Sequence, residues 1–371
     1  MADRADVVIG GGGPAGLSTA IAARLRGFQV TVLDRAHPPI DKACGEGLMP
    51  DGVAVLEGLG VDLRGMDSHP FRGVRYTDDQ LSAKGMFPKE TGLGIRRTEL
   101  HLVLRSRAEE IGVDLRWGVQ IRGLSADGFE TDKGPVRGRW LVGADGRASR
   151  IRLWSGLDGR PAHRRRFGVR RHFELEPWSD LVEVHWADGR EAYVTPVGKS
   201  MVGVALLWSG GPATFDELLV SFPSLQRRVK DAPVMSKDRG AGPLQQRCRA
   251  VISGDLALVG DASGYLDPIT GEGLALSFRQ AVAHVDAIVA GDLGRYVVAH
   301  RRIVRFPNTM TRLLLLVERH PRLRRRVMRS LNADRSLMSR FLALKMRVGG
   351  PRVFGSGGLL PLVAAAIRGA T

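Results

Sequence analysis

Cysteine is scarce in this sequence of 371 residues, which contains only Cys44 and Cys248. Two cysteines do not make a disulfide framework, so we expect a protein of a reducing cytoplasm. No stretch approaches the roughly 20 consecutive apolar residues that a membrane-spanning helix needs. The first residues, Met-Ala-Asp-Arg-Ala-Asp, also lack the apolar segment of a secretory signal. The sequence therefore predicts a cytoplasmic protein that associates at most peripherally with a membrane.

Acidic residues are rare in the last fifth of the chain. Residues 295–371 contain 17 lysines and arginines but only two acids, so this segment carries almost all of the net charge of +16. Its arginines alternate with apolar residues, a pattern typical of basic amphipathic helices that rest on an anionic membrane or an acidic carrier protein. A solvated helical face is the alternative. We expect no nucleic-acid partner, because neither a recognition motif nor interleaved aromatic residues accompany the charge.

Glycine is abundant, and the first of two glycine-rich turns follows the apolar run at residues 7–9. Gly11, Gly13 and Gly16 satisfy the spacing G-x-G-x-x-G between a predicted strand and a predicted helix. In this motif the first glycine allows the tight turn, the second lets a pyrophosphate approach the backbone, and the third lets the helix pack on its strand. The next predicted strand ends at Asp34, whose carboxylate suits a ribose 2′-hydroxyl. These features predict a dinucleotide site.

The second glycine-rich stretch lies some 250 residues downstream, at 258–274. It predicts a buried strand, a turn containing Gly260 and Asp261, a loop that ends at Pro268, and a Gly-x-Gly helix start. This order places one carboxylate beside free backbone N–H groups, which suits a ligand with hydroxyls and an electron-accepting ring. A Gly-Asp pair is also common in ordinary turns. The interpretation of this second stretch as a binding site therefore depends on the dinucleotide site predicted at the first turn.

The remaining patterns predict an α/β protein with two lobes. Helical periodicity occurs at 98–111, and strands are predicted at 113–117, 139–142 and within 245–258. Alternating runs at 168–173, 181–186, 191–195 and 201–207 predict an antiparallel sheet, with a short helix at 223–229. We expect a Rossmann-like nucleotide-binding domain (1–70, 95–160 and 245–295), an inserted antiparallel β-sheet substrate domain (71–94 and 161–244), and a basic helical C-terminus (296–371).

Four elements in combination resemble the FAD-dependent oxidoreductases of the para-hydroxybenzoate hydroxylase and geranylgeranyl reductase superfamily. They are the first glycine turn with its acid, the segment Arg-Thr-Glu-Leu at 97–100, the segment Asp-Gly-x-x-Ser-x-x-Arg at 145–152, and the Gly-Asp turn at 260–261. The resemblance extends over residues from about 5 to 290. It implies that FAD is the cofactor and that the nucleotide-binding domain is an FAD-binding domain.

The resemblance also assigns roles within the FAD site. It implies that Asp34 binds the adenosine ribose, Arg97 contacts the pyrophosphate or ribityl part, Asp261 binds the ribityl hydroxyls, and Asp145 supports the cofactor. Arg97 could instead be a surface residue and Asp145 a turn cap. The complete set of expected cofactor-binding residues is Gly11, Gly13, Ala15, Gly16, Asp34, Arg35, Cys44, Gly45, Arg97, Asp145, Gly260, Asp261, Gly271, Gly273 and Leu274.

Two reactions are implied by the resemblance. In the hydroxylases, NAD(P)H reduces the flavin, and O2 then forms a C4a-hydroperoxide that oxygenates an aromatic ring or an alkene. In the prenyl reductases, the reduced flavin delivers a hydride to an isolated double bond. Two features are similar to the reductases. Gly264 stands where hydroxylases usually have histidine, and Lys-Ala-Cys-Gly at 42–45 matches the reductases' Lys-x-Cys-Gly beside the flavin.

Other features favour oxygenation. Gly-Leu-Met-Pro at 47–50 resembles the helix start Gly-x-x-Leu-x-Pro of the hydroxylases. Only Tyr193 and Pro196 match the reductases' Tyr-x-Trp-x-Phe-Pro, and the Trp-x-Trp-x-Ile-Pro of flavin halogenases is missing. We therefore predict an FAD-dependent monooxygenase of secondary metabolism, with NAD(P)H as reductant and a hydrophobic aromatic or polyketide-like substrate. A geranylgeranyl reductase-like enzyme is the second prediction, and a non-catalytic flavin-bound scaffold is the third.

Cys44 and Tyr193 are the candidate catalytic residues. A thiol beside the flavin could shape the pocket or donate a proton, but a free cysteine is as often a small buried hydrophobe. Tyr193 could cover the flavin ring, although an aromatic residue on a strand more often belongs to the core. The histidines show no metal-ligand spacing, so we expect no metal site.

Overall fold

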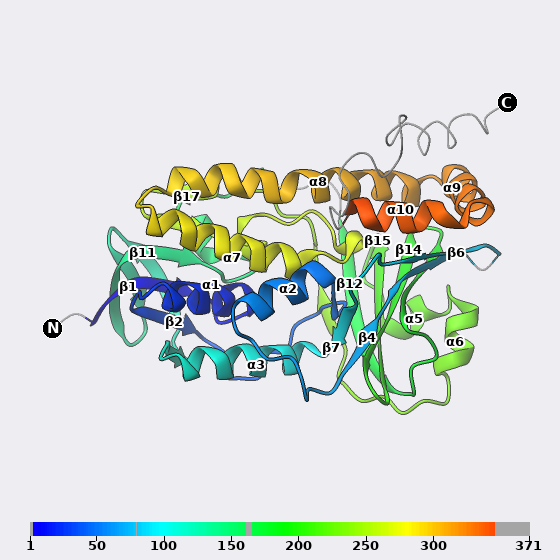
Figure 1. Cartoon of the computed structure of the whole chain (residues 1–371), viewed down its shortest axis with the longest axis horizontal. Helices are drawn as coiled ribbons and strands as arrows, with labels where there is room; N and C mark the ends of the chain where they lie inside the picture. Colours follow the sequence, from blue (N-terminus) through cyan, green and yellow to red (C-terminus); the bar gives the residue numbers. More distant parts are fainter. Residues whose placement is uncertain (1–2, 79, 161–164, 346–371) are drawn as a thin grey trace.

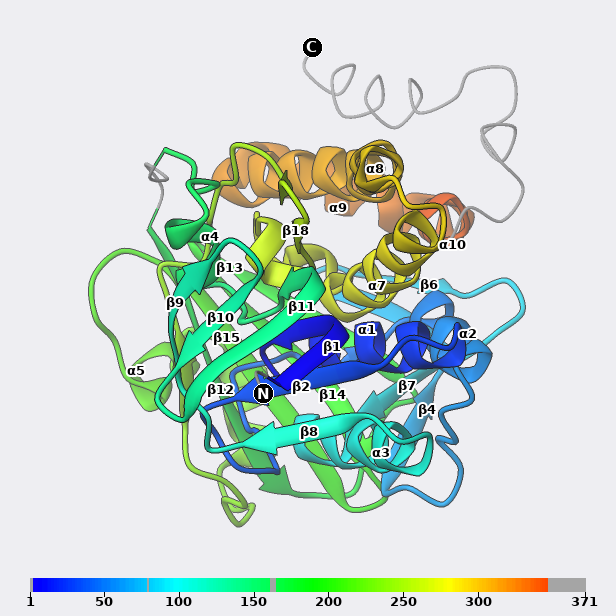
Figure 2. The same cartoon turned by 90° about the vertical axis from the view of Figure 1, so that its left-hand side faces the viewer.

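A parallel sheet around the first glycine turn forms one half of the molecule in the computed structural model, which describes residues 3–78, 80–160 and 165–345. The central strands pair in parallel in the order β11-β1-β2-β8 and lie side by side in Figure 2. The eight strands of this sheet are β1 (Asp3–Gly10), β2 (Val30–Asp34), β8 (Asp114–Trp117), β9 (Ile121–Ser125), β10 (Gly128–Thr131), β11 (Gly134–Gly143), β17 (Ile252–Ser253) and β18 (Leu256–Leu258), with β9 and β10 forming an antiparallel hairpin beside β11. The parallel order confirms the predicted Rossmann-like fold.

Helices cover one face of this sheet and a hairpin covers the other, because the central strands are apolar on both sides. Val7 and Ile9 of β1 pack into the core that contains α1 (Pro14–Leu25) and α7 (Gly273–Val289), and α3 (Arg97–Glu110) lies against α1. Val8 points to the opposite face, where it packs with residues of the hairpin β9 (Ile121–Ser125) and β10 (Gly128–Thr131). Strands were predicted within 245–258, and the structure forms β17 and β18 there, preceded by isolated bridges at Gln246 and Cys248.

The second half of the molecule is a seven-stranded sheet in the order β16-β12-β15-β14-β13-β5-β6, with one parallel pair, β13 with β5. Its strands are β5 (Gly73–Thr77), β6 (Ser82–Met86), β12 (Arg166–Glu174), β13 (Leu181–Ala187), β14 (Arg190–Gly198), β15 (Met201–Ser209) and β16 (Arg239–Ala241). Val202, Val204 and Leu206 of β15 pack on one face with α5 (Phe215–Leu219) and α6 (Pro223–Val229). This face fixes the register, so the alternate residues point the other way, toward the first half.

A small third sheet joins the two halves. It contains β3 (Gly47–Leu48), β4 (Ser68–Phe71) and β7 (Gly92–Ile95), and α2 (Pro50–Gly58) follows β3. Strands β4 and β7 lie against β14 of the seven-stranded sheet. The domain boundaries predicted at 70/71 and 94/95 fall inside these two strands, and the boundary at 295/296 falls inside α8.

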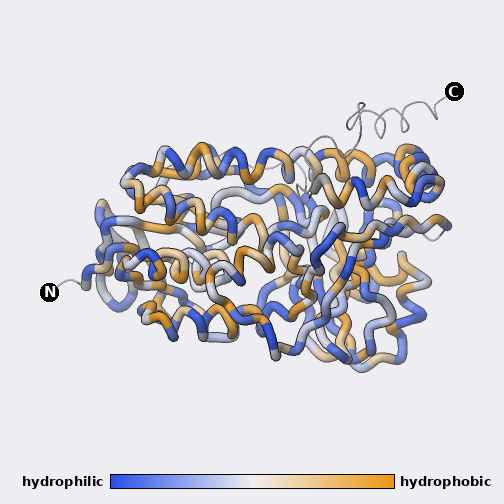
Figure 3. Tube along the Cα trace, viewed as in Figure 1, coloured by the Kyte–Doolittle hydropathy of each residue, from blue (hydrophilic) through white to orange (hydrophobic). Residues whose placement is uncertain are grey.

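Three helices form the described part of the C-terminal region: α8 (Leu293–Arg319), α9 (Pro321–Ala333) and α10 (Arg335–Lys345). Helix α8 runs along both halves of the molecule (Figure 1). The helices alternate between hydrophobic and hydrophilic residues (Figure 3), and Val317, Met328 and Met338 pack into a core shared with β5 and β13. This packing uses the apolar side, whereas arginines such as Arg322 and Arg325 are exposed.

Binding of this surface to an anionic membrane or an acidic carrier protein stays a prediction. Residues 346–371 of the predicted basic C-terminus lie outside the described residues. Within the described ranges, no helix is both long enough and apolar enough to cross a bilayer.

Candidate FAD and substrate site

The first glycine turn can exist only with glycine at two of its positions. Gly11 has a φ of +115°, and a Cβ there would lie 2.4 Å from the carbonyl oxygen of Ala144. A Cβ on Gly16 would lie 1.8 Å from the carbonyl oxygen of Gly11. At Gly13, by contrast, the nearest atom to an added Cβ is Nη2 of Arg97, 3.7 Å away. The turn is therefore closely packed behind Gly11 and Gly16 and open in front of Gly13, where α1 begins.

Asp34 lies at this turn, as its place at the end of β2 predicts. Its Oδ2 accepts a hydrogen bond from the backbone N–H of Gly12 (2.7 Å), and its Oδ1 accepts one from Ala36 (2.8 Å). Buried His101 of α3 contacts the same turn through Nε2, 2.9 Å from the carbonyl oxygen of Gly12. Sequence reasoning missed His101, because a histidine on the inner side of a helix gives no specific signal.

Two cations lie between the two glycine-rich turns. Arg97 begins α3, and its guanidinium lies in front of Gly13. Lys42 comes from the loop after β2. Burial lowers the pKa of Lys42, and so does the charge of Arg97, whereas Asp34, Asp261 and Asp145 raise it. Lys42 therefore interacts with acids from three separate segments of the chain. It was not among the predicted site residues, although the Lys-x-Cys-Gly pattern was a signal for it.

The second glycine-rich stretch begins with the 3-10 helix η1 (Gly260–Ser263) and continues through η2 (Pro268–Thr270) to α7. The N–H of Gly260 donates to Oε1 of Gln280 on α7 (2.7 Å), which holds the turn. Burial raises the pKa of the Asp261 carboxyl, while Arg97, Lys42 and Arg147 lower it. Asp261 therefore interacts electrostatically with Arg97 and Lys42, the two cations that lie beside the first turn. Gly271 and Gly273, which precede Leu274, are exposed.

Asp145 acts as a helix cap. Its Oδ2 accepts hydrogen bonds from the N–H groups of Arg150 (2.8 Å) and Ile151 (3.2 Å) at the start of α4 (Arg150–Trp154). Its Oδ1 is buried and has no hydrogen-bond partner among the described residues. A role of Asp145 toward the cofactor stays a prediction.

The side chain of Arg152, in α4, connects two segments that are distant in the sequence. Its Nη1 donates to the carbonyl oxygen of Ala262 (3.1 Å), and its Nη2 donates to that of Arg147 (3.1 Å). The buried guanidinium thus ties the turn that contains Asp261 to the segment after β11.

The segment that contains Cys44 is bound to the seven-stranded sheet through Glu46. The two oxygens of this buried carboxylate contact the N–H of Arg97 (2.8 Å) and Nε2 of His172 on β12. Glu46 has a φ of +58° and is the one non-glycine residue with positive φ in the described ranges. Such backbone costs about 1–3 kcal/mol and persists only where surrounding contacts enforce it. Burial raises the pKa of Cys44, so its thiol stays protonated at neutral pH.

Tyr193 of β14 reaches the second glycine-rich stretch. Its hydroxyl lies 3.1 Å from Oε2 of Glu191 and 3.1 Å from the carbonyl oxygen of Ile269. A hydroxyl has one proton and can donate to only one of them at a time. Tyr193 thus connects the sheet to the loop before Gly271.

The chemistry of this set of residues fits FAD. The open space in front of Gly13, at the start of α1, suits a pyrophosphate, because helix N-termini and cations such as Arg97 and Lys42 attract anions. Asp34 precedes these cations in the chain and Asp261 follows them. Their carboxylates would accept hydrogen bonds from the hydroxyls of a ribose and a ribityl chain. Arg35, Ala15, Gly45 and the other predicted residues remain predictions as individual ligands.

We expect Asp261→Ala to lower the affinity of the apoprotein for FAD by roughly 10- to 150-fold, since a charged acceptor of a hydrogen bond contributes about 1.5–3 kcal/mol. Titration of FAD followed by flavin fluorescence measures this change. Asp255→Ala, at an exposed acid in the turn between β17 and β18, is the matched control and should leave affinity unchanged. Unchanged FAD affinity in Asp261→Ala would contradict the assigned role.

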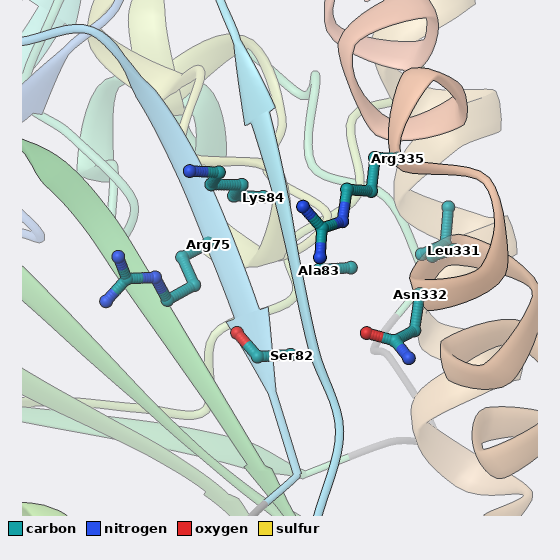
Figure 4. A pocket seen from close by; sticks show the side chains of 7 residues that line it. All are labelled: Arg75, Ser82, Ala83, Lys84, Leu331, Asn332 and Arg335. Atoms are coloured by element: carbon teal, nitrogen blue, oxygen red, sulfur yellow. The ribbon is translucent and has the colours of Figure 1, made fainter.

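A separate cavity of about 300 Å³ lies between the edge of the seven-stranded sheet and helices α9 and α10 (Figure 4). Its lining residues are Arg75, Ser82, Ala83, Lys84, Leu331, Asn332 and Arg335. Nη1 of Arg75 is paired with Oε1 of Glu183 at 2.8 Å. None of these residues belongs to the glycine-rich turns, so the cavity is not part of the FAD site.

Fold and site together define a flavoprotein oxidoreductase that binds its dinucleotide at the carboxyl ends of parallel strands. Residues 4–204 match the family model described as the FAD binding domain, and the chain belongs to this family. It is an FAD-dependent oxidoreductase of the hydroxylase and geranylgeranyl reductase superfamily, as the resemblance predicted.

Relatives come from both branches of the superfamily. The chain is 28% identical to a menaquinone reductase of Mycolicibacterium smegmatis, with 80% of this chain and 79% of the relative covered. It is 26% identical to digeranylgeranylglycerophospholipid reductase 1 of Methanothermobacter thermautotrophicus, with 74% of each covered. It is 25% identical to 3-demethoxyubiquinol 3-hydroxylase of Escherichia coli, with 76% of this chain and 79% of the relative covered.

Solved structures agree on the fold. A flavoprotein/dehydrogenase of Cytophaga hutchinsonii superposes with a TM-score of 0.83 at 17% identity, covering 99% of this chain and 100% of that one. A p-nitrophenol 4-monooxygenase of Pseudomonas putida gives a TM-score of 0.80 at 20% identity, covering 95% and 100%.

Proposed function

We propose that the protein is an FAD-dependent monooxygenase that hydroxylates a hydrophobic, oxygen-substituted aromatic ring. One observation carries the choice: a partly buried hydroxyl, that of Tyr193, lies on the sheet beside the loop before Gly271 and is hydrogen-bonded to buried Glu191. An isolated isoprenoid double bond offers no partner for such groups, whereas a ring hydroxyl does. Among the relatives, 3-demethoxyubiquinol 3-hydroxylase is named as a hydroxylase of a quinol, which supports this choice, whereas menaquinone reductase is named as a reductase.

The residues of this chain would position the cofactor and substrate. Arg97 and Lys42 would hold the anionic centre of FAD, and Asp34 and Asp261 would hold its hydroxyl-bearing arms. When bound and reduced by NAD(P)H, FAD would supply the activation of O2, from which one oxygen atom would enter the ring and the other would leave as water. Overall, substrate, O2, NAD(P)H and a proton give hydroxylated product, water and NAD(P)+. The seven-stranded sheet would cover the bound substrate and exclude water from it.

A reductase of isoprenoid double bonds is the second candidate, and Gly264 favours it. Gly264 has a φ of +117°, a conformation strained for histidine, so this backbone does not suit the residue that hydroxylases usually have there. Lys42 also interacts with Asp261 and Asp34, as a member of the site, which agrees with the Lys-x-Cys-Gly pattern of the reductases.

One experiment separates these reactions. The holoenzyme is reduced anaerobically with NADH or NADPH and then exposed to ¹⁸O2 with a panel of 4-alkylphenols and alkylhydroquinones, or with a geranylgeranyl lipid. We expect a phenolic product that carries one labelled oxygen atom in its mass spectrum. A lipid that gains two hydrogens without O2 would overturn the proposal in favour of the reductase. Protein that takes up no FAD would exclude both reactions.

A further inference from the structure

Helix α8 presents a basic stripe along its outer side. Its inner side packs against α7 and contains buried residues such as Tyr296, Ile303 and Met310. Residues that alternate at spacings of three and four lie on one side of a helix. The exposed residues opposite the buried side follow this spacing, and they are Arg302, Arg305, Thr309, Arg312, Leu316 and Arg319. At 1.5 Å per residue the stripe is about 25 Å long, and it follows α8 along the edge of the molecule (Figure 1).

Acidic side chains are nearly absent from this surface. Residues 293–333, from the start of α8 to the end of α9, contain eleven arginines and one acid, Glu318. Glu318 points inward, where it lies 3.2 Å from buried Arg166 of β12. The same guanidinium is 3.1 Å from Glu191 and 3.0 Å from Asp267, and all four side chains are at most 3% exposed. The negative charge of Glu318 therefore belongs to the interior of the protein.

The exposed arginines of the stripe have no acidic partner on the protein. Arg305, Arg312 and Arg319 form no ion pair with another residue of the described ranges. Helix α9 continues along the same edge of the molecule in both views (Figures 1 and 2). It adds three exposed arginines at spacings of three and four, Arg322, Arg325 and Arg329. Like charges at such spacings repel one another, and a bound anionic surface offsets this repulsion.

Two large apolar side chains interrupt the charge. Leu316 is 48% exposed within the stripe, and Val298, at the next position of the same spacing, is 49% exposed. Nucleic-acid phosphates offer these two side chains nothing, whereas a bilayer offers phosphates to arginines and an acyl boundary to apolar residues. A bilayer is also flat over the length of α8. Charge and apolar side chains together therefore fit a lipid surface.

We propose that the outer side of α8 and α9 docks reversibly on an anionic phospholipid bilayer, with the axis of α8 parallel to the membrane plane. The arginines contact lipid phosphates, and Leu316 and Val298 lie at the level of the headgroups. The apolar side of these helices is already used inside the protein, where Val317 and Met328 belong to the core. Electrostatic attraction therefore provides most of the affinity, which falls with salt. This docking is independent of the reaction at the flavin.

Sedimentation of the FAD-loaded full-length protein with vesicles measures the docking. At about 0.1 M salt we expect binding to phosphatidylcholine vesicles that contain about one third phosphatidylglycerol, little binding to phosphatidylcholine alone, and release at about 0.5 M salt. The triple variant Arg305→Gln, Arg312→Gln and Arg319→Gln should bind about 100-fold more weakly, since each cation near an anionic bilayer contributes roughly fivefold. The three side chains are exposed, so the variant should keep its FAD, which the flavin absorbance reports.

A second triple variant removes the same charge from another surface. Arg227, Arg228 and Lys230 are exposed cations at the end of α6, which lies far from α8 in Figure 1. Their replacement by glutamine gives the same net charge as the α8 variant but should leave vesicle binding within about twofold of wild type. An equal loss in both triple variants would show attraction by net charge alone and would overturn the docking surface.

Leu316→Gln separates a lipid partner from other polyanions. Loss of this half-exposed apolar side chain should weaken vesicle binding by about fivefold. Binding to soluble polyglutamate or to duplex DNA should not change, because neither has an acyl boundary. The proposal is wrong if the wild type does not bind the anionic vesicles. It is equally wrong if the protein binds polyglutamate or DNA more tightly than vesicles at the same concentration of anionic groups.

Discussion

Alanine at Gly16 should destabilise the apoprotein by about 3 kcal/mol or more, beyond the usual cost of overpacking. The added Cβ would lie 1.8 Å from the carbonyl oxygen of Gly11, and backbone atoms cannot move aside as a flexible side chain can. Either α1 or the turn must shift away from the sheet. Urea unfolding of the FAD-free protein, followed by circular dichroism, measures the loss.

Gly13→Ala is the matched variant at the same turn, with the opposite expected result. Gly13 has an ordinary φ of −76°, and an added Cβ meets nothing closer than Nη2 of Arg97 at 3.7 Å. Apoprotein stability should therefore stay within about 1 kcal/mol of wild type. FAD affinity should fall more than about tenfold, because the methyl group occupies the approach of the pyrophosphate to the backbone. Equal FAD affinity in Gly13→Ala and wild type would contradict the placement of the pyrophosphate.

Removal of the Arg166 charge should have the second large effect. We expect Arg166→Leu to lower the free energy of unfolding by about 3–5 kcal/mol at pH 8, because it leaves three buried carboxylates without their cation. Arg64→Leu, which breaks the exposed pair with Asp62, is the control and should change stability by less than about 1 kcal/mol. Adding Glu191→Gln to Arg166→Leu should restore part of the loss.

The pH dependence of this effect has a definite sign. Burial raises the pKa of Glu191 from 4.5 to about 7, so between these values the folded state binds more protons than the unfolded state. Stability therefore falls as the pH rises through this window. Loss of Arg166 raises the carboxyl pKa further, which extends the fall above pH 7. Urea titrations at pH 5 and pH 8 should show a smaller deficit for Arg166→Leu at pH 5, and an equal deficit at both would exclude this explanation.

Local patterns in the sequence predicted most of the fold. The alternating runs that became β12, β14 and β15 are apolar on the face that packs against α5 and α6, and period-2 burial is readable from sequence. The predictions were weaker where the chain is held by distant contacts. Residues 245–251 look like a strand but are held by isolated bridges and by contacts such as Arg249 N–H to Leu157. Arg152 is likewise held by a distant contact, with the carbonyl oxygen of Ala262, 110 residues away.

The residues of the site also fall into those placed by local geometry and those placed by distant contacts. Gly11, Gly13, Gly16 and Asp34 were predictable because one turn and the next strand place them together through local geometry. His101 and Glu46 were not, because their partners lie far away in the chain: His172 is 126 residues from Glu46. A residue's identity reveals its charge and size, but not which distant group will meet it.

By itself, the sequence determined a Rossmann-like FAD-binding turn, an antiparallel sheet beside it, and membership in a flavoenzyme superfamily, because these depend on short-range spacing of glycines and apolar residues. Only the tertiary structure brought the second glycine-rich stretch beside Arg97 and Lys42, and only it gathered Glu191, Asp267 and Glu318 around Arg166. Burial in a shared interior changes the acidity of such groups, and burial arises only when the whole chain has folded.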